Sequence, residues 1–137
     1  MSEDESDYLS DSEENEAPPR GEKVKKVIQF SDIGHPIGPG SIQYASFVGQ
    51  MARAHCRPIF VDWKVVPDTV KEHIWDTVSD DYELEYKRKV LVLKKANISW
   101  KNWKYKLRMA YDNYSTDADR LANMPANVKL EDWESFI

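Results

Sequence analysis

This chain of 137 residues has one cysteine, Cys56, so no internal disulfide can form, and a lone thiol is typical of a reducing compartment. The sequence also lacks any apolar run of the roughly 20 residues that a membrane-spanning helix needs. Its beginning is acidic and has no basic segment followed by an apolar one, as a secretory signal would have. These absences predict a soluble intracellular protein that does not bind membranes.

The chain offers little for catalysis or metal binding. His55 and Cys56 are adjacent and point in different directions on a helix, while His35 and His73 have no second ligand at the spacing of a zinc site. The loop at residues 34–40 is rich in glycine and proline but lacks the spacing and the Lys-Ser/Thr ending of a phosphate-binding loop. We therefore expect a non-catalytic protein without a cofactor or a metal ion.

Negative charge is concentrated at the start of the chain. The first 19 residues hold eight acids and no lysine or arginine, and we expect residues 1–20 to be a disordered acidic tail because they bury too little surface to offset their ordering entropy. Ser10 and Ser12 lie in a context that acidophilic kinases use, although an unmodified solubilising tail explains the sequence equally well. One hypothesis is that the tail folds back on cations elsewhere and competes with an anionic partner.

The rest of the chain predicts a mainly α protein, a small bundle of three to four helices. We expect an extended arm and a loop at residues 21–40, the helical bundle at 41–115, and a loop with a short C-terminal helix at 116–137. Three lysines near the start of the arm are compatible with nuclear import. The C-terminal helix stops in the middle of its apolar pattern, which is typical of a truncated product or of a fragment of a longer chain. Its apolar set is Trp133, Phe136 and Ile137.

Two helices are predicted in the first half of the bundle. The first covers about residues 42–55, with Ser41 as its N-cap, and Gly49 inside it suggests that a neighbour packs closely there. The second begins after Pro67, where Thr69-x-x-Glu72 has the pattern of a capping box, and ends near residues 80–81.

Residues 86–111 form the most distinctive stretch, with nine cations and no acid. Residues 86–95 are expected to be helical and anchored by Val90, Leu91 and Leu93. A turn at 96–99 and a helix at 99–114 would follow, but one continuous helix over 86–113 is the alternative. Trp100, Trp103 and Leu107 recur at helical spacing and predict a buried stripe, as Trp75 does in the preceding helix.

The cations of this helix are our candidate site. We expect them to fall on a stripe turned away from the tryptophans, where they would contact the phosphate backbone of DNA. A solvated helix face is the simpler alternative, because lysine normally lies at the surface. The candidate nucleic-acid-binding residues are Lys94, Lys95, Lys101, Lys104, Lys106 and Arg108.

Several segments, in this order and spacing, resemble the plant transposase-associated family of the Ptta and En/Spm type. They are residues 34–38, 47–53, 63–67, 71–75, 100–107 and Trp133. The resemblance covers about residues 30–137 and implies a transposon-derived protein without an established activity. A helix followed by a tryptophan-rich basic helix also resembles Myb/SANT and trihelix DNA-binding domains. Cut-and-paste transposases need three carboxylates on a ribonuclease-H-like sheet, and a helical domain of this size has no such sheet.

Two functions follow from these features. The first is a transposon-derived, DNA-binding helical module. The second is a protein-interaction module in which the helices and the C-terminal apolar set dock on a partner or on another copy of the chain. A degenerate transposon fragment without a function of its own is the remaining alternative.

Overall fold

The computed structural model describes residues 24–136, so the expected acidic tail (residues 1–20) and Ile137 lie outside it. The described chain is mainly helical, which confirms the predicted fold class. Its elements are β1 (Gln29–Phe30), β2 (Pro36–Ile37), α1 (Ser41–His55), the 3-10 turn η1 (Trp63–Val65), α2 (Asp68–Asp81), the 3-10 turn η2 (Tyr86–Arg88), α3 (Lys89–Asp112), α4 (Asp117–Ala122) and α5 (Leu130–Phe136).

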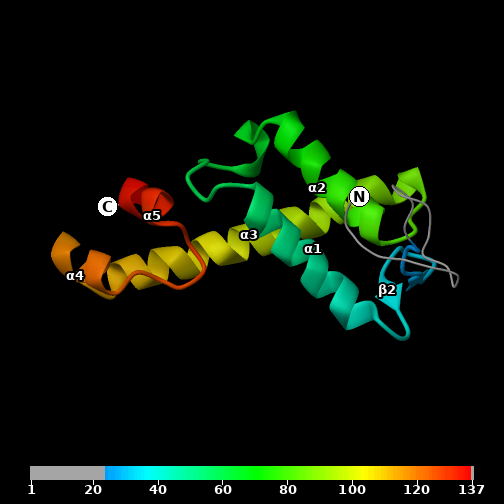
Figure 1. Ribbon diagram of the computed structural model, residues 1–137, viewed down its shortest axis with the longest axis horizontal. Helices are drawn as coiled ribbons and strands as arrows, with labels where there is room; N and C mark the ends of the chain where they lie inside the picture. Colours follow the sequence, from blue (N-terminus) through cyan, green and yellow to red (C-terminus); the bar gives the residue numbers. More distant parts are fainter. Residues whose placement is uncertain (1–23, 137) are drawn as a thin grey trace, which may run out of the picture.

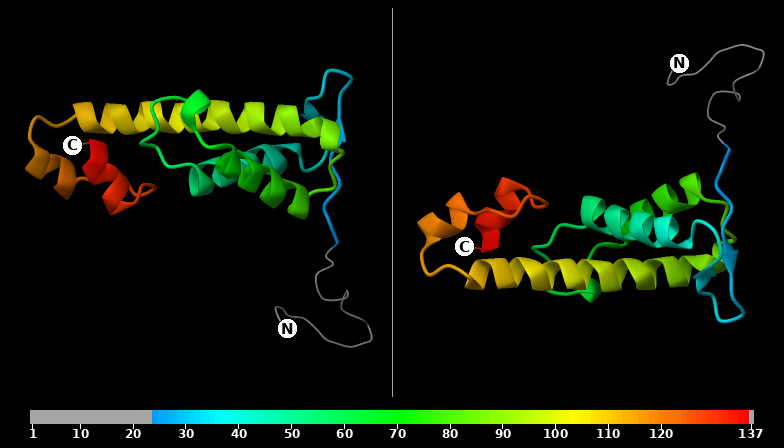
Figure 2. Two further views of the ribbon diagram at one scale, coloured as in Figure 1. Left: turned by 90° about the horizontal axis from the view of Figure 1, so that it is seen from above. Right: turned by 90° about the horizontal axis from the view of Figure 1, so that it is seen from below.

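The long helix α3 runs through the whole body, and the other helices pack along it. In Figure 1, α1 and α2 lie beside its N-terminal half, whereas α4 and α5 lie beside its C-terminal half. Figure 2 shows that all four helices lie on the same side of α3. The opposite side of α3 is therefore left uncovered by the other α-helices of the described chain, and only η1 and the β-hairpin reach past α3 toward it.

The helix α3 is continuous, so the turn predicted at residues 96–99 is wrong. The alternative of a single helix over residues 86–113 is right except for residues 86–88, which form the 3-10 turn η2. Ala96 is fully buried within a stripe that continues to Trp100, which extends the helical period across the predicted turn. Val90, which was predicted to anchor this helix in the core, is 74% exposed, and Val92 is buried in its place.

The starts of α1 and α2 differ from the predicted caps. Gly40, with φ 83°, is the N-cap of α1, and Ser41 is its first helical residue. Only glycine adopts this backbone conformation at no steric cost. The predicted capping box of α2 does not form, because no side chain caps that helix. Its Glu72 instead pairs with Lys89 at the start of α3.

Tryptophans form much of the core. Trp100 is fully buried, and Trp75 and Trp103 are nearly so, which confirms their predicted inner faces. Trp100 Nε1 donates a hydrogen bond to the carbonyl oxygen of Arg57, 3.2 Å away, and so ties α3 to the end of α1. Trp103 Nε1 has no partner among the described residues.

The C-terminal segment is helical as predicted, and it closes back on the body. Trp133 is fully buried and its Nε1 donates to the carbonyl oxygen of Arg120 at 2.9 Å. Asp132, only 4% exposed, forms an ion pair with Arg57 at 2.7 Å. Trp133, which was predicted to dock on a partner, therefore packs inside its own chain, and Phe136 is half-buried beside it.

The predicted arm pairs with the body near the end of α2. The main chain of Lys26 accepts from Glu83 and donates to Asp81, and the short hairpin of β1 and β2 follows. In the described part of the chain, no helix is both long and apolar enough to cross a membrane.

Candidate nucleic-acid interface

Charge in the described chain is segregated between helices. Residues 33–61, which include α1, contain no acid, and neither do residues 86–111, which make up most of α3. These two helices pack against each other, so their shared surface has no carboxylate from either of them. By contrast, α2 carries four exposed acids at a spacing of four residues: Asp68, Glu72, Asp76 and Asp80. The α1–α3 side of the molecule is therefore its basic side.

A first set of cations lies on the uncovered side of α3. Lys94, Lys101 and Arg108 are exposed and recur every seven residues, which places neighbours about 10.5 Å apart along the helix. We call these three residues the outer row. None of them forms an ion pair within the described chain. Tyr105 lies on the same side and is 67% exposed, so an aromatic ring stands beside this row.

A second set of cations lies in a groove between α1 and α3. Two surface hollows of about 550 and 440 Å³ meet at Arg53 and Ser99, and Lys95 and Lys106 line one hollow each. We call this surface the α1–α3 groove. Three cations and the neutral side chains of Ser46, Gln50, Ser99, Asn102 and Asn127 supply its polar lining, and no described acid contributes to it. Such a lining suits an anion with several oxygen acceptors, such as a phosphodiester.

A glycine explains why the groove forms here. A Cβ atom at Gly49 would lie 3.3 Å from Ser99 Oγ and 3.2 Å from a guanidinium nitrogen of Arg53. The two helices therefore approach each other closely at Gly49, as the sequence suggested, and Arg53 lies against the crossing point. Sequence reasoning missed Arg53 because it considered only the basic run of α3. The absence of acids from residues 33–61 would have pointed to it.

Lys104 does not belong to either surface. It was predicted on the outward stripe, but the loop before η1 covers its flank of α3. Its Nζ atom donates to the carbonyl oxygens of Phe60 and of Val61, the latter at 3.2 Å, and lies 4.4 Å from the centroid of the Trp100 ring. Burial lowers the pKa of Lys104 below its usual value. This ammonium group is used in packing, so only five of the six candidate cations face solvent.

Two other kinds of site were considered from the sequence, a metal site and a nucleophilic cysteine. Within residues 24–136, no cluster of three or more His, Cys, Asp or Glu side chains could hold a metal ion. Cys56 is fully buried, and this burial raises the pKa of its thiol to about 11. The thiol is therefore protonated at neutral pH, and the thiolate that a nucleophilic cysteine needs is not formed there.

We compared the chain with known protein families, curated proteins and solved structures, and none of the three comparisons finds a match. The resemblance to the plant transposase-associated family stays a prediction from the sequence.

Proposed function

We propose that this protein is a non-catalytic nucleic-acid-binding module that contacts the phosphate backbone through the basic side formed by α1 and α3. The observation that carries the proposal is the α1–α3 groove, where Arg53, Lys95 and Lys106 line two adjoining hollows that have no described carboxylate in their lining. The outer row adds three cations on the adjoining flank of α3. Because most of these cations are lysines, the contacts favour charge neutralisation over bidentate reading of bases.

The groove and the outer row are separable by mutation. Titration of the full chain with random-sequence duplex DNA at several salt concentrations gives the slope of log affinity against log salt, which changes by about 0.9 for each phosphate contact. One variant carries Arg53→Glu, Lys95→Glu and Lys106→Glu. A second variant carries Lys94→Glu, Lys101→Glu and Arg108→Glu. We expect the groove variant to lose most of the binding and the outer-row variant to lose a smaller part.

A matched control separates local contacts from net charge. The variant Lys25→Glu, Lys64→Glu and Lys87→Glu changes the charge by the same amount at three exposed positions outside both surfaces. The proposal requires that this control binds far better than the groove variant. Equal losses in all three variants would show that only net charge matters, and no binding by the natural chain at low salt would exclude the proposed function.

The family resemblance supports the same proposal from another direction. A transposon-derived protein of the plant transposase-associated type would act on DNA, and in a plant cell it would reach its target in the nucleus. We include this origin and this location in the proposal. Imaging of a fluorescent fusion in plant cells tests the location.

Protein association is the second candidate function. It is favoured by the apolar side chains on the uncovered side of α3, where Ile98, Tyr105 and Met109 are each about half exposed or more. The C-terminal set predicted for this role is less available, because Trp133 is buried. Sedimentation of the full chain over a range of concentrations tests this candidate. A concentration-dependent dimer that Met109→Glu disrupts, together with an absence of DNA binding, would favour it.

A further inference from the structure

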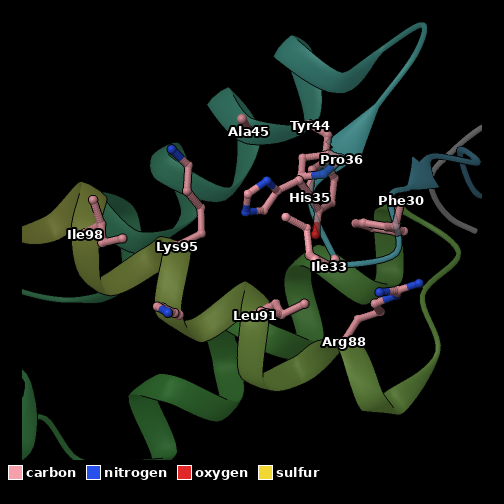
Figure 3. Close-up of a pocket in the computed structure, with 12 residues that line it drawn as sticks. Phe30, Ile33, His35, Pro36, Tyr44, Ala45, Arg88, Leu91, Lys95 and Ile98 are labelled. Carbon is pink, nitrogen blue, oxygen red and sulfur yellow. The ribbon is translucent and has the colours of Figure 1, made fainter.

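An apolar pocket lies at the N-terminal end of α3, next to the α1–α3 groove, with which it shares Ala45 and Lys95. It has a volume of about 370 Å³, within the range of ~300–1,000 Å³ of ligand sites in proteins. Figure 3 shows its walls: the β-hairpin loop with Ile33 and Pro36, the first turn of α1, and the outer side of α3 with Leu91. Ile33 is 73% exposed and Leu91 is half-buried, so both offer apolar surface that a ligand would cover.

The hairpin loop is held close to α3 at this pocket. Gly34 is buried with φ 87°, and a Cβ atom there would lie 2.4 Å from a methyl group of Leu91. Any other residue at Gly34 would be strained at this positive φ, and its Cβ atom would require the Leu91 side chain or the loop to shift. The close approach of Gly34 to Leu91 therefore fixes the position of the loop against α3 at one wall of the pocket.

Positive charge surrounds the pocket. Arg88, Lys94 and Lys95 contribute to its lining together with His35, and no described acid does. The guanidinium of Arg88 stacks on the ring of Phe30, with 4.3 Å between the guanidinium carbon and the ring centroid. The pocket therefore suits an apolar group flanked by negative charges.

The chain itself contains such a segment. Tyr8 and Leu9 are the only large apolar side chains between residues 2 and 23, and they lie within the sequence Asp7-Tyr8-Leu9-Ser10-Asp11. This is the combination that the pocket suits, an aromatic and an aliphatic group between carboxylates.

The connection between this segment and the pocket is short. Phe30, which lines the pocket, follows Leu9 by 21 residues. The 15 residues from Leu9 to Val24 span at most about 50 Å when extended, which exceeds the dimensions of the pocket several times. A connection of this length gives an effective concentration of the order of millimolar, so even a weak contact would be substantially populated.

We propose that this pocket binds the segment around Tyr8 and Leu9 of the same chain, with its carboxylates facing Arg88, Lys94 and Lys95. The proposal gives the hypothesis of a folded-back tail a specific anchor. It also has a consequence that rests on the proposed function: Lys94 belongs to the outer row and Lys95 to the α1–α3 groove, so a bound tail would compete with nucleic acid.

Paramagnetic broadening tests the contact in the full chain without nucleic acid. A nitroxide label on Ser12→Cys reports on the methyl signals of Ile33, Leu91 and Ile98, and buried Cys56 stays unlabelled under native conditions. We expect strong broadening of these signals. The variant Tyr8→Ser with Leu9→Ser keeps all eight acids of residues 1–19, and we expect at least a severalfold reduction of the broadening.

A matched pair of substitutions tests the pocket side. Ile33→Glu places an acid at the pocket, whereas Val90→Glu places one at an equally exposed position that does not line it, since the two residues are 73% and 74% exposed. We expect only Ile33→Glu to abolish the broadening. Equal broadening with and without Tyr8 and Leu9 would overturn the proposal, because general charge attraction would then explain the contact. Broadening that disappears on dilution would also overturn it, because the contact would then form between chains.

Discussion

The Nζ atom of Lys104 lies 4.4 Å from the centroid of the Trp100 ring. It also donates a hydrogen bond to the carbonyl oxygen of Val61, in the loop that connects α1 to η1. An ammonium group over an indole ring contributes about 1–2 kcal/mol when it is partly desolvated, and its bonds to the loop carbonyls add to this. We therefore expect Lys104→Ala to lower the free energy of unfolding by about 2 kcal/mol. Urea denaturation followed by tryptophan fluorescence measures the change.

Lys101 is the natural control for Lys104, because it lies one turn earlier on α3 and is exposed without a partner in the described chain. We expect Lys101→Ala to leave stability within about 0.5 kcal/mol of the natural chain, as for most surface substitutions. For DNA affinity we expect the opposite ranking, because Lys101→Ala should weaken DNA binding more than Lys104→Ala does. A greater loss of stability in Lys101→Ala would contradict the observed faces of α3.

Trp103→Ala tests the inner face of α3. Trp103 is 6% exposed, and truncation of a buried tryptophan costs about 3–5 kcal/mol through lost burial and the cavity that remains. Trp63, half-buried against Trp100 with 5.7 Å between ring centroids, gives the comparison. We expect a clearly smaller loss for Trp63→Ala. Thermal unfolding followed by circular dichroism measures both, and a melting temperature unchanged by Trp103→Ala would be incompatible with the structure.

The inner residues of α3 could be predicted because their spacing reflects local geometry alone. Trp100, Trp103 and Leu107 recur at the period of a helix, and the structure buries all three. The turn predicted at residues 96–99, just before Trp100, does not form. The local sequence does not show how strongly this segment packs into the core. Asn97 and Ser99 have low helix propensity, but Ala96 and Trp100 pack into the core on either side of them, and tertiary packing outweighs such differences of a few tenths of a kcal/mol.

The composition of the candidate site was less predictable. Arg53 and Ser99 are 46 residues apart in sequence and meet only because Gly49 lets α1 and α3 approach closely. Lys104 is a lysine on the same helix as Lys101 and Lys106, yet it is covered by a loop that lies more than 40 residues earlier in the sequence. Helical spacing predicts the side of a helix on which a residue lies, but it does not predict which other segment covers that side.

Asp132→Ala tests the attachment of the C-terminal segment. This carboxylate is 4% exposed and pairs with Arg57, whose side chain is 50% exposed, so the pair is only partly shielded from water. We expect a loss of roughly 1–2 kcal/mol, below the cost of breaking a fully buried pair. Hydrogen exchange should accelerate in α5 more than in α2. Uniform acceleration would show that α5 unfolds together with the rest of the body, and no acceleration would show that the ion pair contributes nothing.

The buried thiol of Cys56 predicts how stability depends on alkaline pH. Burial raises its pKa from 9.0 to about 11, although Lys104 and Lys71 act in the opposite direction. Between these two values the unfolded chain loses the thiol proton and the folded chain keeps it, so the unfolded state binds fewer protons and stability falls as pH rises. This thiol contributes at most about 1.4 kcal/mol per pH unit to the fall. Lys104 and Tyr44 also titrate differently in the folded chain, so the comparison must be made between variants at each pH. Urea denaturation from pH 8 to 11 should show a steeper decline for the natural chain than for Cys56→Ala, and parallel curves would show that the thiol titrates alike in both states.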